Sequence, residues 1–231
     1  MRRLSFDIEI AEIFELAPGE DLARYGPFHI TVAATANPLG ESQLWFSEDS
    51  AGKPAPQLTQ QRAYELLQFL DKEQSAGTQV FAWNGLGFDF KWLGHHAEAP
   101  ELASKVALRS YDPMFQFFNI AGFPVGLAKV AEGMGIHQKK TLHGSQAPVL
   151  WAAGDYQTVM DYVVGDCELT NQVVGAIERR GEVRWITARG TPSSKFMGGL
   201  KTVEAVINDP PPDQSWMRDP PRKESFFGWL C

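Results

Sequence analysis

The stretch Leu-Ser-Phe-Asp-Ile-Glu-Ile at residues 4–10 constrains the fold of this chain more than any other. Its apolar residues occur at every second position, which predicts a β-strand with one buried face. Residues two apart on a strand point to the same side, so the carboxylates of Asp7 and Glu9 should be neighbours. Like charges this close repel, and a divalent cation between them is the usual solution. An edge strand with a solvated acidic face would show the same alternation, and for one strand alone it is the simpler interpretation.

Composition indicates a folded protein with an acidic balance. The 231 residues are 44% hydrophobic and 12% aromatic, which is enough for one sizeable core. No apolar run is long enough to span a membrane, and the first residues do not resemble a signal peptide. With two cysteines a disulfide framework is not expected, so we predict a cytoplasmic protein with no membrane association. The net charge of −7 argues against a broad electrostatic attraction to nucleic acid.

Strands and helices are expected to alternate after an initial antiparallel meander. Turn residues at 37–40 join two of the first three strands. The predicted strands are 3–10, 28–36, 43–47, 79–83, 105–109 and 182–188, and the predicted helices are 59–73, one opening at 84–89, one from 113, 125–134 and 155–180. Residues 137–151 are interpreted as a polar loop. This order implies an α/β fold, with a mixed sheet of antiparallel meander and parallel strands flanked by helices.

The last part of the chain has a different character. Beyond Gly190 it is rich in Gly and Pro, with one helix-like piece at 200–207 and an apolar end at 226–230 that we expect to dock back. We therefore divide the chain into a domain at 1–190 and a Pro-rich C-terminal extension at 191–231 that packs on it. A protein partner could bind through this extension.

Three further polar residues stand out from their surroundings. Asp89 lies in the first turn of a helix that directly follows a strand, a junction where sites form in α/β proteins. Asp166 lies in the middle of an apolar helix, where an acid is unfavourable unless it has a partner. Tyr162 precedes it by four residues and therefore shares its helical face.

These residues fall into three motifs. Asp-x-Glu lies on the first strand, Asn-x-x-x-Phe-Asp at 84–89 and Tyr-x-x-x-Asp at 162–166. The set resembles the exonuclease motifs of the DEDD superfamily, in its DEDDy branch. That branch includes ribonuclease D and the proofreading domain of family-B DNA polymerases. The stretches 111–114 and 147–157 resemble most the stand-alone exonucleases related to the family-B domain, and the likeness covers about residues 4–180.

The resemblance implies a ribonuclease H-like fold and a metal-dependent 3′-to-5′ exonuclease. Asp7, Glu9, Asp89 and Asp166 would bind two divalent ions, Mg²⁺ or Mn²⁺, and Tyr162 would orient the attacking water. The expected substrate is single-stranded DNA, and the expected products are nucleoside 5′-monophosphates. A ribonuclease D-like exoribonuclease would carry the same motifs. A catalytically silent ribonuclease H-like module that binds nucleic acid is the alternative from another class, and the oligomeric state stays open.

Several residues are candidates for substrate contacts. Asn84 resembles the asparagine of the second motif that contacts the substrate end, although a turn residue would look the same. Phe88 and Ile10 could meet a terminal base or simply pack in the core, and Lys139 and Lys140 could meet phosphates or lie in a solvated loop.

The basic part of the chain offers a second set. Residues 179–223 hold nine basic and five acidic residues, a net charge of +4. We expect phosphate-backbone contacts among Lys195, Lys201, Arg218, Arg222 and Lys223. We also expect Asp112 to cap the helix that follows it, and His95 and His96 to lie at the surface.

Overall fold

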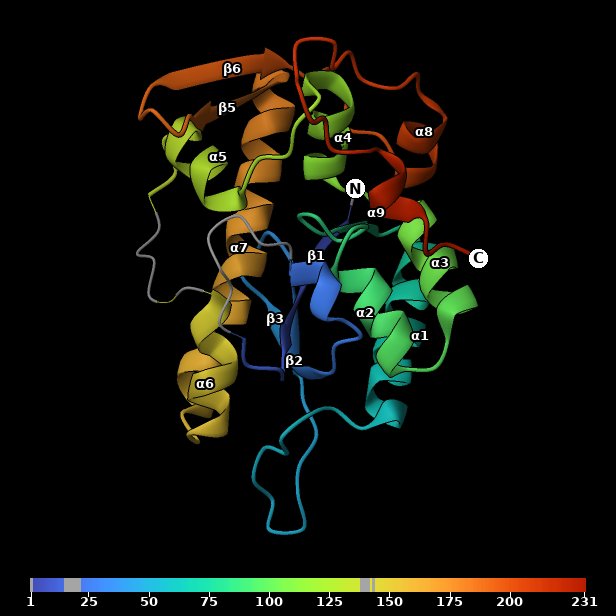
Figure 1. Cartoon of the computed structure of the whole chain (residues 1–231). Helices are drawn as coiled ribbons and strands as arrows, with labels where there is room; N and C mark the ends of the chain where they lie inside the picture. The colour runs from blue at the N-terminus through green and yellow to red at the C-terminus, as the bar shows by residue number, and fades with distance from the viewer. Residues whose placement is uncertain (1, 15–21, 138–141, 143) are drawn as a thin grey trace.

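Four strands form the central sheet in the order β3–β2–β1–β4 (Figure 1). β1 (Arg3–Ile10) is antiparallel to β2 (Ile30–Ala36) and parallel to β4 (Gln79–Phe81), and β3 (Ser42–Trp45) pairs antiparallel with β2. The antiparallel meander and the mixed α/β class expected from the sequence are confirmed. The computed structural model describes residues 2–14, 22–137, 142 and 144–231.

Helices cover both faces of this sheet (Figure 1). The longest, α7, packs against β1 and β2 on one face, and the cluster built from α1, α2 and α3 packs on the other. The helices of the described residues are α1 (Gln60–Ser75), α2 (Asp89–His96), α3 (Pro100–Arg109), α4 (Pro113–Ala121), α5 (Leu127–Met134), α6 (Ala147–Ala152), α7 (Tyr156–Arg180), α8 (Val203–Asn208) and α9 (Glu224–Phe227), with 3₁₀ turns at Leu22–Tyr25 and Gly144–Gln146.

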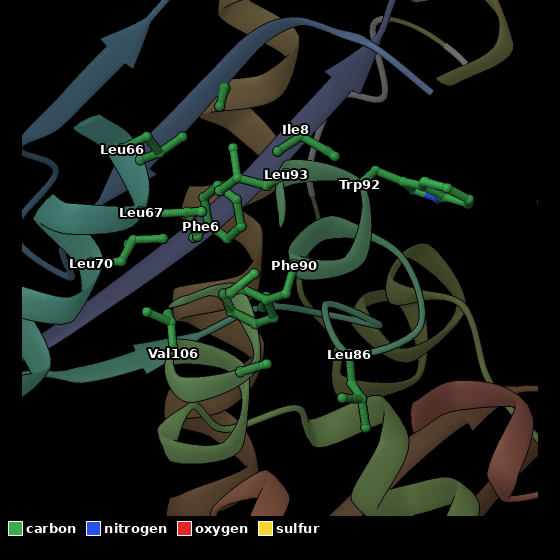
Figure 2. Packing of buried hydrophobic residues seen from close by; sticks show 14 of the residues in the cluster. Phe6, Ile8, Leu66, Leu67, Leu70, Leu86, Phe90, Trp92, Leu93 and Val106 are labelled. Atoms are coloured by element: carbon green, nitrogen blue, oxygen red, sulfur yellow. The ribbon is translucent and has the colours of Figure 1, made fainter. Parts of the chain in front are cut away.

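Alternation along β1 divides its side chains between the two layers. Phe6 and Ile8 are buried in the main core, where side chains of α1, α2 and α3 surround them (Figure 2). The odd-numbered residues Ser5, Asp7 and Glu9 point to the opposite side of the strand and face α7. The alternation read from the sequence therefore fixes which residues can meet that helix.

A small polar network fastens α7 to this face of the sheet. The hydroxyl of Ser5 lies 2.9 Å from the carbonyl oxygen of Ala36 and 2.8 Å from that of Cys167. The amide nitrogen of Asn171 donates to the Ser5 hydroxyl at 2.8 Å and to the Ala36 carbonyl at 2.9 Å. All of these groups are buried, so their bonds specify one register of the helix against the strands.

Two of the sequence predictions are wrong. Residues 105–109 are not a strand but the end of α3, because Ala103, Val106 and Ala107 are buried together at helical spacing. On the edge of β4 that faces away from β1, parallel pairing among the described residues is limited to one bridge between Phe81 and Tyr111.

The second error concerns the segment 137–151, which is not a continuous loop. Its end forms a 3₁₀ turn and α6, a helix too short to show a periodic pattern. Trp151 of α6 is buried and donates from Nε1 to the carbonyl of Ala55 at 2.9 Å.

The C-terminal part begins with a two-stranded antiparallel sheet. β5 (Glu182–Ile186) forms where a strand was predicted, and β6 (Pro192–Phe196), which was not predicted, pairs with it. This sheet packs on α5, where Gly133 is needed: a Cβ atom there would lie 2.4 Å from the Cα of Trp185. The division of the chain at residue 190 stays a prediction.

The apolar end of the chain docks as expected. Phe226, Phe227, Trp229 and Leu230 pack against the main core. No helix in the described part of the chain has the length and apolar character needed to cross a membrane.

Candidate active site

Three carboxylates from two elements meet between β1 and α7. Asp7, Glu9 and Asp166 each offer one oxygen, and these oxygens all lie within 4.8 Å of one another. Glu9 is buried, whereas Asp7 and Asp166 are half-buried. The cluster arises because β1 turns its odd-numbered residues towards α7 and the Ser5–Asn171 network sets the height of that helix.

Electrostatics make this cluster unfavourable without a cation. Burial raises the pKa of Asp7 well above its ordinary value, and the charges of Asp89, Asp166 and Glu9 raise it further. Burial raises the pKa of Glu9 likewise, with added repulsion from Asp166 and Asp89. Hard divalent cations such as Mg²⁺ and Mn²⁺ prefer carboxylate oxygens, so this donor set fits them. Deprotonation of the cluster would then accompany metal binding.

Asp89 approaches the cluster from the other side of β1. Pairing of β1 with β4 ends at Ser5, and further along the strand the backbone N–H of Ile8 donates to Asp89 Oδ1 at 3.1 Å. Burial raises the pKa of Asp89 to about 7, helped by the charges of Asp112 and Asp166 and opposed by this hydrogen bond. Asp89 is close enough to raise the pKa of Asp7, although it is not one of the three residues of the tightest group.

Tyr162 lies one helical turn before Asp166, and its hydroxyl hydrogen-bonds to that carboxylate. Burial raises the pKa of the phenol, and the negative charges of Asp166 and Glu9 raise it further. The hydroxyl therefore keeps its proton at neutral pH and acts as a hydrogen-bond donor. Gly144 is a close neighbour, since a Cβ atom at this position would lie 3.7 Å from the tyrosine oxygen.

A tight turn at residues 84–88 delivers Asp89. Asn84 adopts a left-handed conformation with φ of 66°. The buried carboxylate of Asp112 accepts hydrogen bonds from the N–H groups of Asn84 and Leu86 in the turn and from Phe115 in α4, each at 3.0 Å. Burial raises the pKa of Asp112 to about 6, and these bonds oppose the shift. Asp112 is thus the helix cap that the sequence predicts and also holds the turn.

Clefts open on both sides of the acidic cluster. The first has a volume of about 580 Å³ and a mostly apolar lining that includes Glu9. The second has a volume of about 690 Å³, lies between α5 and α7, and includes Tyr162 and Asp166. The first cleft is lined by Ile8, Glu9, Ile10, Glu12, Phe14, Leu22, Phe88, Gly144, Ser145 and Pro148.

The candidate substrate residues divide between this cleft and other places. Ile10 and Phe88 line the first cleft beside Glu9, but Asn84 is not among the described residues that line it. The Asn84 amide lies over Gly87 instead, where a Cβ atom would be only 2.7 Å from its oxygen. Lys139 and Lys140 fall outside the residues that the structure describes.

Two expectations about charged residues are wrong. Lys223 is buried and donates from Nζ to the carbonyls of Val206, Ile207 and Asp209, so it has no free ammonium for a phosphate. His96 is not at the surface, because both ring nitrogens bond to buried backbone groups.

Sequence reasoning missed part of the cleft lining. The sequence analysis does not single out Glu12, Phe14 or Leu22, and it places Ser145 and Pro148 only in a polar loop. Glu12 is held in place by His29, whose Nδ1 lies 2.8 Å from a carboxylate oxygen. Ile13, which like Ile10 could meet a terminal base or anchor the loop, directly precedes Phe14, and this apolar pair after the strand is the signal in the sequence for an apolar site here.

Residues 48–173 match the family model of the RNase_H superfamily. Because the match covers more than half of the chain, the protein belongs to this superfamily. Its members are usually nucleases, which indicates nucleic acid as the class of substrate and hydrolysis as the class of reaction. The matched segment includes Asp89, Tyr162 and Asp166, and β1 with Asp7 and Glu9 precedes it. No curated protein matches the chain.

Proposed function

We propose that this protein is a metal-dependent 3′-to-5′ exonuclease of the DEDDy type, related to the proofreading domain of family-B DNA polymerases. Its substrate is the 3′ end of single-stranded DNA, and its products are nucleoside 5′-monophosphates. The observation that carries the proposal is the meeting of Asp7, Glu9 and Asp166 within 4.8 Å, beside a protonated tyrosine, in a member of the RNase_H superfamily.

All four acidic residues contribute to the proposed metal site. Asp7, Glu9, Asp89 and Asp166 would hold two divalent ions, which would activate the attacking water and stabilise the departing 3′ oxygen. The Asp89 carboxylate accepts a hydrogen bond from the Ile8 N–H, and this bond orients it for binding. Tyr162 keeps its phenolic proton, so it can orient the attacking water by a hydrogen bond without removing a proton from it.

The apolar cleft supports a terminal base next to the reacting phosphate. Phe88, Ile10 and Phe14 offer apolar and aromatic surfaces directly beside Glu9. Stacking and apolar contact of this kind accept any base, as an exonuclease that proceeds along a strand requires. A single strand can place its last base in such a cleft, whereas a base in a duplex must first leave its stack.

A cleavage ladder tests the proposal. Single-stranded DNA and RNA of one sequence, labelled at the 5′ end, are incubated with Mg²⁺, Mn²⁺ or a chelator, with substrate in excess of enzyme. We expect a ladder that shortens one nucleotide at a time from the 3′ end of the DNA and requires metal. Asp7→Asn should abolish it, whereas Asp155→Asn, an exposed acid at the start of α7, should not.

Each other outcome has a defined meaning. Faster shortening of the RNA would favour the ribonuclease D-like enzyme. Internal fragments would contradict an exonuclease. Metal-dependent binding with no turnover would leave a nucleic-acid-binding module in place of an enzyme.

A further inference from the structure

The C-terminal end of the described chain lies against the turn that carries Asp89. The indole N–H of Trp229 donates to the carbonyl of Leu86 at 2.8 Å, and is shared with the carbonyl of Phe226 at 3.1 Å. Leu86 is itself fully buried, so this carbonyl has little access to water as an alternative partner. The bond joins segments 143 residues apart, and it reaches the turn three residues before Asp89.

The ring of Phe226 makes a second contact with the same turn. A Cβ atom at Gly87 would lie 3.1 Å from Phe226 Cδ1 and 2.7 Å from Asn84 Oδ1. The backbone of Gly87 is therefore enclosed between this ring and the Asn84 amide. Phe226 in turn packs on Phe115 and Phe118 of α4, with ring centroids 5.5 and 4.8 Å apart.

The turn is consequently held from two directions. Asp112 binds its N–H groups at Asn84 and Leu86, and Trp229 binds its carbonyl at Leu86. Asn84 adopts the left-handed region, which asparagine tolerates, so the turn carries little backbone strain and its shape is fixed by these bonds. The backbone between Asn84 and Asp89 is therefore fixed by its contacts with both Asp112 and Trp229.

The extension that carries these aromatic residues is itself firmly attached. Lys223, directly before α9, donates at 2.8, 3.1 and 2.9 Å to the carbonyls of Val206, Ile207 and Asp209, which lie in α8 and just after it. The N–H of Val203 at the start of α8 donates to the carbonyl of Ser110, two residues before Asp112. The contacts of the turn with Asp112 and with Trp229 are therefore both connected to the segment around Asp112.

We propose that Phe226 and Trp229 are positioning residues for Asp89. By fixing the turn at 84–88, they set where the Asp89 carboxylate stands relative to Asp7, and so how well the acidic site binds divalent metal. The inference rests on the proposed function, in which Asp89 is a metal ligand. It makes the C-terminal extension a point of control, since anything that displaces the extension would weaken the metal site.

Trp229→Phe tests the inference because it keeps an aromatic ring and removes the N–H donor, together with part of the apolar surface of the indole. The matched control is Trp216→Phe, an exposed tryptophan of the same extension that contacts Phe123 and not the turn. The first measurement is Mn²⁺ binding by titration calorimetry, without nucleic acid. The second is kcat and KM on a 5′-labelled single strand, and the third is the melting temperature.

For Trp229→Phe we expect Mn²⁺ affinity to fall about 10- to 100-fold, the range for groups that orient metal ligands. Turnover should fall while KM for the strand stays within about twofold. Trp216→Phe should match wild type in all three measurements. Unchanged Mn²⁺ affinity and kcat in Trp229→Phe would overturn the inference and leave the extension a purely structural role.

Two further results complete the test. If Trp229→Phe does not fold, Phe226→Leu, which keeps an apolar side chain against Gly87, must show the loss of Mn²⁺ affinity. If both variants lose the fold, the extension is part of overall stability and the inference fails. If wild type binds Mn²⁺ but cleaves nothing, the proposed function fails while the calorimetric comparison still decides the positioning role.

Discussion

At the scale of single residues, burial and the neighbouring carboxylate of Asp166 limit the chemistry of the Tyr162 phenol. Burial, and then the negative charges of Asp166 and Glu9, raise the pKa of the phenol, so the hydroxyl cannot remove a proton at neutral pH. The hydroxyl can form a hydrogen bond. Tyr162 is half-buried beside the second cleft, so a molecule bound in that cleft can reach it. The tyrosine is thus suited to orient a group and unsuited to act as a base.

Tyr162→Phe should therefore reduce turnover without changing its pH dependence. The ring and its packing remain, and only the hydroxyl is lost. We expect a loss of about 10- to 1,000-fold in single-turnover cleavage of a 5′-labelled oligonucleotide, within or below the range for proton-handling groups. Substrate affinity should hold. A wild-type rate would place Tyr162 outside the reaction, and loss of an alkaline limb would show that the phenol titrates in it.

At the scale of elements, α2 is held at both ends by polar contacts with β1 and β2. Asp89 at its start accepts from Ile8 of β1. His96 at its end accepts at Nδ1 from the N–H of Ile30 in β2 at 2.8 Å and lies 2.9 Å through Nε2 from the Leu58 carbonyl. An imidazole that accepts at one nitrogen and donates at the other must be neutral. Burial, and then the neighbouring His29, lower the pKa of His96 accordingly.

This pairing predicts a loss of stability as pH falls. The folded-state pKa of His96 is lowered, so below about pH 6.5 the unfolded chain takes up a proton that the folded protein does not. The contribution is fully present above the unfolded-state pKa and is lost as pH falls towards the folded-state pKa. We expect the free energy of unfolding, measured with denaturant from pH 7.5 to 5, to fall less steeply in His96→Gln than in wild type.

Comparison of variants is needed because other groups titrate in the same range. The pKa values of Asp89 and Asp112 are raised to about 7 and about 6, and these carboxyls lower stability as pH rises. The difference between wild type and His96→Gln removes their effect. His95→Gln, at the exposed neighbouring position, should keep the wild-type slope. Equal slopes in all three proteins would contradict the assignment of a neutral His96.

Lys223 gives a second prediction for the elements. The last carbonyls of a helix have no hydrogen-bond donors within the helix. Lys223 donates three hydrogen bonds to such carbonyls at the end of α8. Lys223→Met keeps the apolar stem and removes these donors, so we expect a loss of about 2–3 kcal/mol. For a chain of this length that is roughly 4–12 °C in melting temperature. Lys195→Met, at an exposed position in β6, should change it little; an equal fall would contradict the buried role of Lys223.

At the scale of the whole molecule, the acidic site joins parts of the chain that are far apart in sequence. Its carboxylates come from β1, the start of α2 and the middle of α7. A cation bound only by the folded protein stabilises it by about 2.7 kcal/mol at 100 times its Kd. We expect Mg²⁺ or Mn²⁺ to raise the melting temperature by roughly 5–10 °C over chelator.

The same carboxylates should make the metal-free protein more stable when one is removed. Asp7→Asn removes a carboxyl whose pKa is raised by burial and then by the charges of Asp89, Asp166 and Glu9, so its metal-free melting temperature should equal or exceed that of wild type. It should also respond weakly to metal. A metal-induced shift of wild-type size in Asp7→Asn would contradict the assignment of the site.

A structural feature can be predicted from the sequence when residues close together in the chain determine it. The alternation along β1 predicted which face carries Asp7 and Glu9, and helical spacing paired Tyr162 with Asp166. The strand predicted at 105–109 failed because five residues with Val106 among them fit either periodicity, and burial against α1 and α2 decided for a helix. The roles of Lys223 and His96 depend on carbonyls far away in the chain, which no local pattern reveals.

The contact between Trp229 and Leu86 has a consequence for biosynthesis. The turn that carries Asp89 leaves the ribosome 143 residues before the indole that completes its hold. At roughly 5–20 residues per second, that interval is about 7–30 s. During the first part of this time the nascent chain still lacks Asp166 of α7. If Trp229 positions Asp89, the acidic site then binds metal weakly until Trp229 follows. The order of synthesis would then keep the nuclease activity of the nascent chain low while single-stranded messenger RNA lies close by.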